Sequence, residues 1–153
     1  MAEVTIRLTE PGDAEHLATH LRPADAHEVR AYGHTDLTWA CQRSVACSVL
    51  CWSAFIDGEL AAILGCAPVS LVSGIGSPWM LATPVLDAHA RVLVRVTPGY
   101  IAKMLQAFPH LVNHVHTENV TSVRWLRRLG FTVHEAQPFG ALGEPFHPFE
   151  LRA

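Results

Sequence analysis

The chain has 153 residues, a formal net charge of -3, 50% hydrophobic residues and 16% charged residues. This length and composition favour one globular domain over residues 1–153 and exclude a disordered chain. The slightly acidic balance gives no attraction to nucleic acids, and the apolar stretches are too short and too interrupted to anchor the chain in a membrane.

The first third of the chain is predicted to contain one strand and three helices. Apolar and polar residues alternate over Val4–Leu8, which is typical of a strand. Thr9 then offers a helix cap, with Pro11 in the first helical turn. Two further helices are expected over residues 25–31 and 36–48.

A three-stranded meander is expected next. Residues 49–56 are rich in residues that favour strands, and Asp57-Gly58 is a strong signal for a two-residue hairpin turn. Residues 60–66 then form the partner strand. The run Pro-Trp-Met-Leu-Ala-Thr over residues 78–83 gives the third strand.

The segment 84–109 allows two interpretations. Its apolar residues keep helical spacing, which predicts one long helix over residues 87–108, kinked at Pro98-Gly99. Alternatively, a loop leads into a shorter helix that Thr97 caps, with Pro98 in its first position.

The C-terminal part is expected to return to the sheet. We predict a strand over residues 111–116, a helix over 120–129 closed by Gly130, and strands over 131–134 and 146–151. A loop rich in Gly and Pro separates the last two strands. The order of elements indicates an α/β (α+β) fold with a mixed sheet and helices on both of its faces.

The four cysteines show no disulfide or redox pattern. Cys41, Cys47, Cys51 and Cys66 form no C-x-x-C pair, and the chain opens directly on a strand-like segment. We expect four buried thiols in a reducing compartment, which is the cytoplasm.

Residues 119–131 resemble a conserved segment of the GNAT acetyltransferases. The segment has Asn119, a small residue three positions later, and an apolar helix that ends in Gly-Phe. Ile6-Arg7 and Asp13-Ala14 also resemble the opening of that family. The resemblance implies a GNAT-like fold and a reaction in which acetyl-CoA, if it binds, donates an acetyl group to an amine.

A narrower resemblance links the chain to internal virion proteins of short-tailed phages, a GNAT-like branch. The segments that carry it are residues 21–25, 57–59, 78–81, 100–105, 111–113, 124–126 and 146–150. It implies a structural or interaction protein of a phage or prophage, with other virion proteins or a host protein as partners, or a second copy of itself. The protein would lie in the host cytoplasm or be packaged in the virion.

The pyrophosphate loop of the GNAT family is poorly matched. In one alignment Pro84, Asp87 and His89 replace the family's Arg or Gln and two glycines; in the other the loop falls on residues 97–102, where Tyr100 replaces a glycine. A carboxylate at this point repels a diphosphate, and side chains keep the backbone away from it. The sequence therefore indicates a degenerate acetyl-CoA site, with no cofactor if the protein is inactive.

Four residues could still bind the cofactor. Arg91 and Arg95 could supply positive charge, although solvated surface residues are the simpler interpretation. Asn119 and Ser122 match the conserved segment, which implies a contact of Asn119 with the pantetheine arm. The same Asn119 could equally cap the following helix.

The catalytic assignment rests on Asn119 and His116. His116 and His114 share one face of a strand, and Glu59 is a further candidate base. Position 126, where many relatives have the tyrosine that protonates the leaving thiolate, is a leucine. We predict no metal site, because no third ligand has the characteristic spacing. The alternative to a structural protein is therefore an active N-acetyltransferase that acts on an amine of a host protein or a small molecule.

Overall fold

The computed structural model describes residues 2–153. Its strands are β1 (Val4–Leu8), β2 (Leu50–Ile56), β3 (Glu59–Ser70), β4 (Ile75–Ala82), β5 (His110–His116), β6 (Thr132–Val133), β7 (Gln137–Phe139) and β8 (Glu144–Arg152). Its helices are α1 (Asp13–Thr19), α2 (Pro23–Ala31), α3 (Leu37–Cys47), α4 (Pro84–Asp87), α5 (Ala90–Ala107) and α6 (Val120–Arg128).

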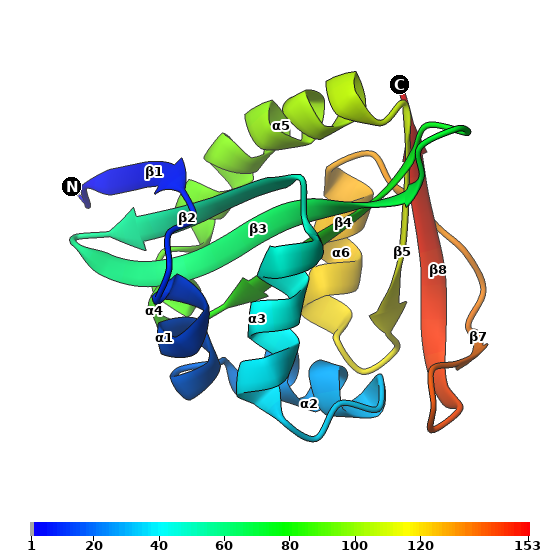
Figure 1. Ribbon diagram of the computed structural model, residues 1–153, viewed down its shortest axis with the longest axis horizontal. Helices are drawn as coiled ribbons and strands as arrows, with labels where there is room; N and C mark the ends of the chain where they lie inside the picture. The colour runs from blue at the N-terminus through cyan, green and yellow to red at the C-terminus, as the bar shows by residue number, and fades with distance from the viewer. Residues whose placement is uncertain (1) are drawn as a thin grey trace.

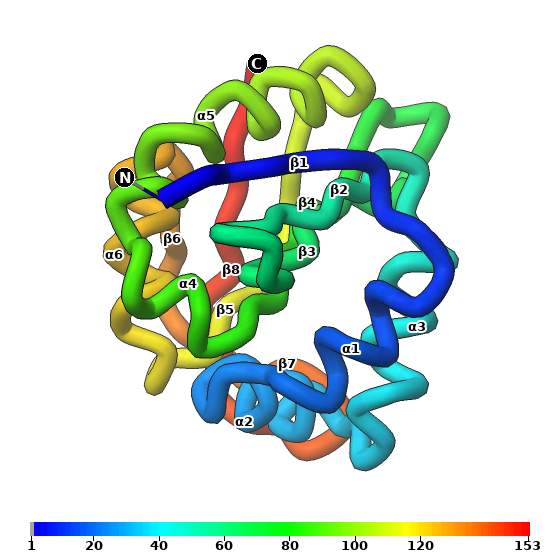
Figure 2. The backbone as a smooth tube through the Cα atoms, turned by 90° about the vertical axis from the view of Figure 1, so that its left-hand side faces the viewer, coloured from blue at the N-terminus to red at the C-terminus, as the bar shows by residue number. Residues whose placement is uncertain are grey.

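The strands form one mixed sheet in the order β1-β2-β3-β4-β5-β8-β6, with β7 paired to β8 (Figure 1). Neighbouring strands are antiparallel except β4 and β5, which are parallel. Helices α1 to α3 lie on one side of the strands and α5 and α6 on the other (Figure 2). The predicted α/β fold with a mixed sheet and helices on both faces is confirmed.

Strand β3 packs against helices on both faces because its two sets of alternate side chains are apolar. Ile63 lies in a cluster with Leu17 of α1 and Cys41 of α3. Its neighbour Leu64 lies in a second cluster with Met104 of α5 and Leu126 of α6. These two clusters hold the helices to the sheet on opposite sides.

The predicted start of the first helix, with Thr9 as its cap, is wrong. Helix α1 begins at Asp13, and its cap residue is Gly12 in the left-handed region with φ 95°, rather than Thr9. The Thr9 hydroxyl lies 3.0 Å from that of Ser53, and Asp13 accepts hydrogen bonds from Arg7 and Ser53. These contacts across β1 and β2 keep residues 9–11 outside the helix.

The segment 84–109 follows the long-helix interpretation more closely than the alternative with a loop. Pro98 lies inside α5, and the Thr97 hydroxyl donates to the Leu93 carbonyl within the same helix at 2.6 Å. The alternative prediction, in which Thr97 caps a shorter helix, is therefore wrong. Helix α5 begins at Ala90, three residues after the predicted start, and residues 88–89 separate it from the short α4.

The C-terminal loop and two of the four cysteines also differ from the predictions. The C-terminal loop contains strand β7, which was missed because its residues, Gln137–Phe139, include a proline and precede a Gly-Ala-Leu-Gly turn. Cys41 and Cys66 are buried as predicted, but Cys51 is half-buried and Cys47, the last residue of α3, is exposed. Within residues 2–153, none of the helices has the length and apolar character needed to cross a bilayer.

Strands β4 and β5 pair only at their N-terminal ends and then separate. The two pairs are Ile75 with His110 and Gly76 with Leu111. Gly76 allows this close approach, because a Cβ at that position would lie 2.6 Å from the Phe108 ring. Pro78 has no N–H to continue the ladder, so the strands diverge beyond it.

Candidate functional site

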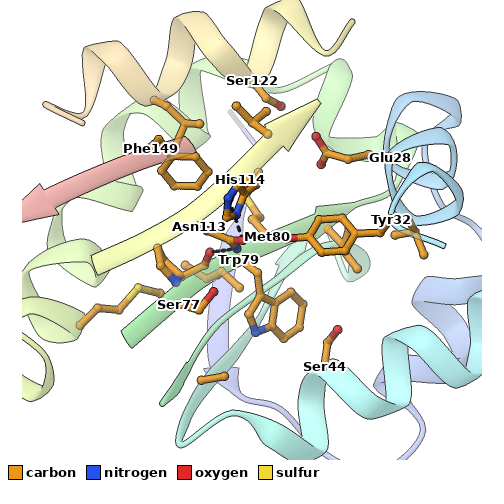
Figure 3. Close-up of a pocket in the computed structure, with 18 of the residues that line it drawn as sticks. Glu28, Tyr32, Ser44, Ser77, Trp79, Met80, Asn113, His114, Ser122 and Phe149 are labelled. Atoms are coloured by element: carbon orange, nitrogen blue, oxygen red, sulfur yellow. Dashed lines mark hydrogen bonds between the residues drawn. The ribbon is translucent and has the colours of Figure 1, made fainter. Parts of the chain in front are cut away.

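A cavity of about 370 Å³ occupies the space where β4 and β5 diverge (Figure 3). We call it the central cavity. Helices α2 and α3 line it on one side of the sheet and α5 and α6 on the other, so it passes through the sheet between the two strands. Its lining includes Glu28, Tyr32, Trp39, Arg43, Ser44, Trp79, Met80, Ile101, Met104, Asn113, His114, Ser122, Trp125 and Phe149.

Asn113 bridges the gap between the diverging strands. Its side-chain amide donates to the Pro78 carbonyl of β4 at 2.7 Å, while its Oδ1 accepts from the Tyr32 hydroxyl at 3.1 Å. Burial and the nearby Glu28 raise the pKa of Tyr32 to about 12, so this phenol remains a hydrogen-bond donor. One side chain of β5 thus takes the place of the missing backbone pairing.

Backbone groups further along the same edge of β4 also bond to other parts of the protein. The Ala82 N–H donates to Asp25 Oδ2 at 2.8 Å, and the Ala82 carbonyl accepts from the Arg22 N–H at 2.9 Å. The Asp25 carboxylate is held by the Arg22 guanidinium. Because backbone groups of alternate residues face the same edge, Met80 lies between two occupied positions, Pro78 and Ala82. We call residues 78–82 on this side the open edge of β4.

Glu28 is the carboxyl group of the central cavity. It projects from α2 toward β5, and its Oε1 accepts from the His116 N–H at 2.6 Å (Figure 3). Glu28 is half-buried, and its side chain lines the cavity. Desolvation by burial raises its pKa from 4.5 to about 7, although hydrogen bonds from His116 and Asn119 act in the opposite direction. A carboxyl with this pKa can accept or release a proton near neutral pH.

The His116 side chain lies beside the cavity lining rather than in it. Its ring is buried against Phe146, its Nδ1 accepts from the Glu118 N–H at 3.1 Å, and its Nε2 lies 3.2 Å from Glu144. His116 contributes its backbone N–H to Glu28. Its role as a catalytic residue stays a prediction.

His116 also forms a compact group with His27 and Glu118, whose potential ligand atoms lie within 4.8 Å of one another. A neutral imidazole has one lone pair on nitrogen, and Nδ1 of His116 already uses it for the Glu118 N–H. A metal ion could bind this ring only at the expense of that hydrogen bond. We therefore assign no metal to this group.

Asn119 and Ser122 lie together at the start of α6. The Asn119 side chain is the N-cap of the helix and accepts from the Ser122 N–H at 3.4 Å. Ser122 lines the central cavity, and the nearby Asn119 side chain acts to lower the pKa of Glu28. The capping interpretation of Asn119 accounts for its side-chain oxygen, and its proximity to Glu28 places it beside the cavity. The cofactor role of both residues stays a prediction.

The start of α5 lacks the glycines that would let backbone N–H groups approach an anion closely. Arg91 and Arg95 are exposed on this helix, while Thr97, Ile101 and Met104 of the same helix line the cavity. The sequence between β4 and α5 contains no glycine. Asp87, which ends α4, is engaged by the Arg22 guanidinium at 3.2 Å. The cofactor role predicted for Arg91 and Arg95 is not tested by this geometry.

The fold is that of the GNAT acetyltransferases. The Salmonella typhimurium protein yncA, solved with its cofactor acetyl-CoA, matches with a TM-score of 0.71 at 15% identity, over 97% of this chain and 93% of its own. RimL, a ribosomal L7/L12 alpha-N-protein acetyltransferase in complex with coenzyme A, matches with 0.72 at 9% identity, over 97% and 93%.

A GNAT-family acetyltransferase from Bacillus anthracis also matches, with a TM-score of 0.72 at 12% identity, over 99% of this chain and 96% of its own. At these identities the likeness establishes the fold alone. The sequence matches no protein-family profile, and no curated protein matches it significantly.

The sequence did not identify Glu28, Asn113 or Asp25 as site residues. Glu28 and Asp25 lie on a helix far in sequence from the strands they contact, and no motif of the sequence assigns them a role in binding or catalysis. Asn113 could have been found from the sequence, because its polar amide lies within an apolar strand. A buried amide at such a position needs partners, which here are Pro78 and Tyr32.

Proposed function

We propose that this protein is a phage or prophage protein with a GNAT fold, which serves as a structural or interaction protein of the virion and has a degenerate acetyl-CoA site. The observation that carries the proposal is that groups of the protein already bond to the backbone of Pro78 and Ala82 along the open edge of β4. The pantetheine arm of CoA is a linear chain with two amides, which need backbone partners when they are buried. Here Asn113 occupies the Pro78 carbonyl, and Asp25 and Arg22 occupy both backbone groups of Ala82.

The approach to this edge supports the same conclusion. A diphosphate binds best where free backbone N–H groups converge at a helix start, and glycines allow that approach. Asp87 brings a carboxylate to this region, and no glycine lies between β4 and α5. These features support a degenerate acetyl-CoA site.

The phage assignment rests on the sequence resemblance described above. Other virion proteins, a host protein or a second copy of the chain are the proposed partners. The chain would then be present in purified particles at a fixed copy number that resists nuclease and high-salt washes. Its complete loss from washed particles would contradict a role in the virion.

Thermal melting with and without acetyl-CoA tests the degenerate site. A ligand at a hundred times its dissociation constant adds about 2.7 kcal/mol of stability, which for a domain of this size raises Tm by roughly 5 °C or more. We expect no shift with millimolar acetyl-CoA and none with ADP as the control. A shift with acetyl-CoA but not with ADP would overturn the proposal.

An active N-acetyltransferase is the second candidate, and the central cavity with Glu28 favours it. The cavity passes through the sheet, and Glu28, with a pKa of about 7, could take the proton from an amine in its reach. The test is release of free CoA across a panel of amines. Turnover that Glu28→Gln abolishes would support this candidate, and background rates throughout would remove it.

A further inference from the structure

The central cavity is lined mainly by apolar and aromatic side chains. On the side of α2 and α3, the rings of Tyr32, Trp39 and Trp79 contribute to its wall. The Trp79 indole is fixed, because its Nε1 donates to the Ser48 hydroxyl at 2.7 Å and its ring covers Gly65, where a Cβ would lie 2.8 Å from it. The wall therefore offers fixed aromatic faces to a ligand.

Formal charge is scarce in this lining. Among the described lining residues, Glu28 provides the carboxylate and Arg43 the guanidinium. Arg43 is exposed on α3, whereas Glu28 projects into the cavity from α2 (Figure 3). Asp25 and Arg22 also act on Glu28 through their charges, but they form their own ion pair and neither lines the cavity. The interior of the cavity thus has one acidic position in an apolar and aromatic surrounding.

We propose that the central cavity binds a small aromatic monoamine, with its ring among the aromatic side chains and its ammonium group paired with the Glu28 carboxylate. Aromatic faces attract a cation and also pack against an aromatic ring. A second ammonium group would be desolvated without a partner, which disfavours polyamines. A carboxylate ligand would face Glu28 and be repelled.

The proposed ligand uses side chains that line the central cavity and no group of acetyl-CoA, so its binding can be tested without that cofactor. The inference therefore goes beyond the proposed virion role. An amine that binds while acetyl-CoA produces no melting shift would support both proposals. Absence of amine binding would remove this inference and leave the virion role intact.

Calorimetric titration of the full chain with phenethylamine at about pH 8 tests the inference. Phenethyl alcohol has the same body without the charge, hydrocinnamate has the opposite charge, and putrescine has two charges without the ring. We expect phenethylamine to bind about tenfold more tightly than phenethyl alcohol, which corresponds to one charge-assisted hydrogen bond. Hydrocinnamate and putrescine should bind more weakly than the alcohol.

Two variants connect this preference to the cavity. Glu28→Gln should reduce the roughly tenfold preference to about one, because the amide carries no charge. Glu135→Gln, which changes an exposed carboxylate between β6 and β7, is the matched control and should retain the preference. Ser44→Phe places a ring in the cavity from α3 and should abolish binding of both compounds, while circular dichroism verifies the fold.

Equal binding of amine and alcohol by the unmodified protein would overturn the proposal. Preference for hydrocinnamate would also overturn it and would identify Arg43 as the group that recognises the ligand. Amine binding that survives Ser44→Phe at full strength would place the ligand outside the central cavity and overturn the proposal as well.

Discussion

The two edges of β4 are held by different kinds of interaction. Toward β3 the strand forms a backbone ladder that extends from Ala62 paired with Ala82 to Ser70 paired with Ile75. Toward β5 the ladder stops after Gly76, and side chains of Asn113 and Asp25 complete the edge. A continuous backbone ladder leaves no space between two strands. Hydrogen bonds through side chains hold the strands further apart and leave space for the central cavity.

This difference shows how one strand can serve both the core and a site. The β3 side depends on packing, so it should be sensitive to added volume and insensitive to pH. The β5 side depends on buried polar groups, so it should respond to loss of a hydrogen bond and to titration of Glu28. The four predictions below test this contrast, from the largest expected effect to the smallest.

Titration of Glu28 should give the largest effect. Its pKa is raised from 4.5 to about 7 in the folded protein, because burial disfavours the charged form. The stability that this group contributes is therefore full below pH 4.5 and declines by roughly 3 kcal/mol as the pH rises through 7. Urea unfolding at pH 5 and pH 8 measures it.

Glu28→Gln should remove this decline and make the protein more stable than the unmodified chain at pH 8. The Gln carbonyl can still accept from the His116 N–H. Glu135→Gln changes an exposed carboxylate and should keep the full pH dependence. A parallel decline in all three proteins would show that another group causes it.

Gly76→Val should overpack the core where β4 passes between Cys66 of β3 and Phe108. Its Cβ would lie 2.6 Å from the Phe108 ring and 2.8 Å from the Cys66 sulfur, both of them buried. We expect a loss of about 2 kcal/mol in the free energy of unfolding, from overpacking of the core.

Gly99→Ala provides the control for Gly76, because a Cβ at Gly99 meets nothing within 4 Å and the position is helical. This change should be neutral or slightly stabilising. If both variants lost the same amount, the tight contact at Gly76 would not be the cause.

Asn113→Ala should cost about 1.5 kcal/mol, because the Pro78 carbonyl and the Tyr32 hydroxyl lose their partner in a partly buried place. The loss should appear equally at pH 5 and pH 8, in contrast to the Glu28 effect. Chemical unfolding of the variant measures it. An unchanged free energy would show that the bridge contributes no net stability to the open edge of β4.

Tyr32→Phe should have the smallest effect, about 1 kcal/mol, because it removes one hydrogen bond and keeps the ring. The ring also contacts Phe139 and Phe146 edge to face, so its packing remains. A double-mutant cycle with Asn113→Ala should show that the two losses are not additive. Additive losses would mean that Tyr32 and Asn113 act independently.

The order and type of most elements could be predicted from local signals. The alternation over Val4–Leu8, the Asp57-Gly58 turn and the apolar period over residues 120–129 each identified an element that the structure contains. These signals depend on a few neighbouring residues. The cap at Thr9 failed because its competitor, the contact with Ser53 on β2, lies far along the chain.

The site was less predictable, because its groups meet only in the folded chain. Glu28 contacts His116, and Asp25 contacts Ala82, across long stretches of sequence. The missing glycines before α5 were visible in the sequence and indicated a degenerate cofactor site. The occupants of the open edge of β4 could not be inferred, because a hydrogen-bond partner leaves no local pattern when its donor lies on another element.

The parallel pairing of β4 with β5 also divides the chain into two consecutive halves. Strands β1 to β4 come from residues 4–82 and strands β5 to β8 from residues 110–152, with α5 passing from one half to the other. Each half forms its antiparallel contacts among its own strands. The seam between them requires contacts that are distant along the chain, so we expect it to form last during folding. Backbone amides along this seam should then exchange with solvent through partial opening, before the halves themselves unfold.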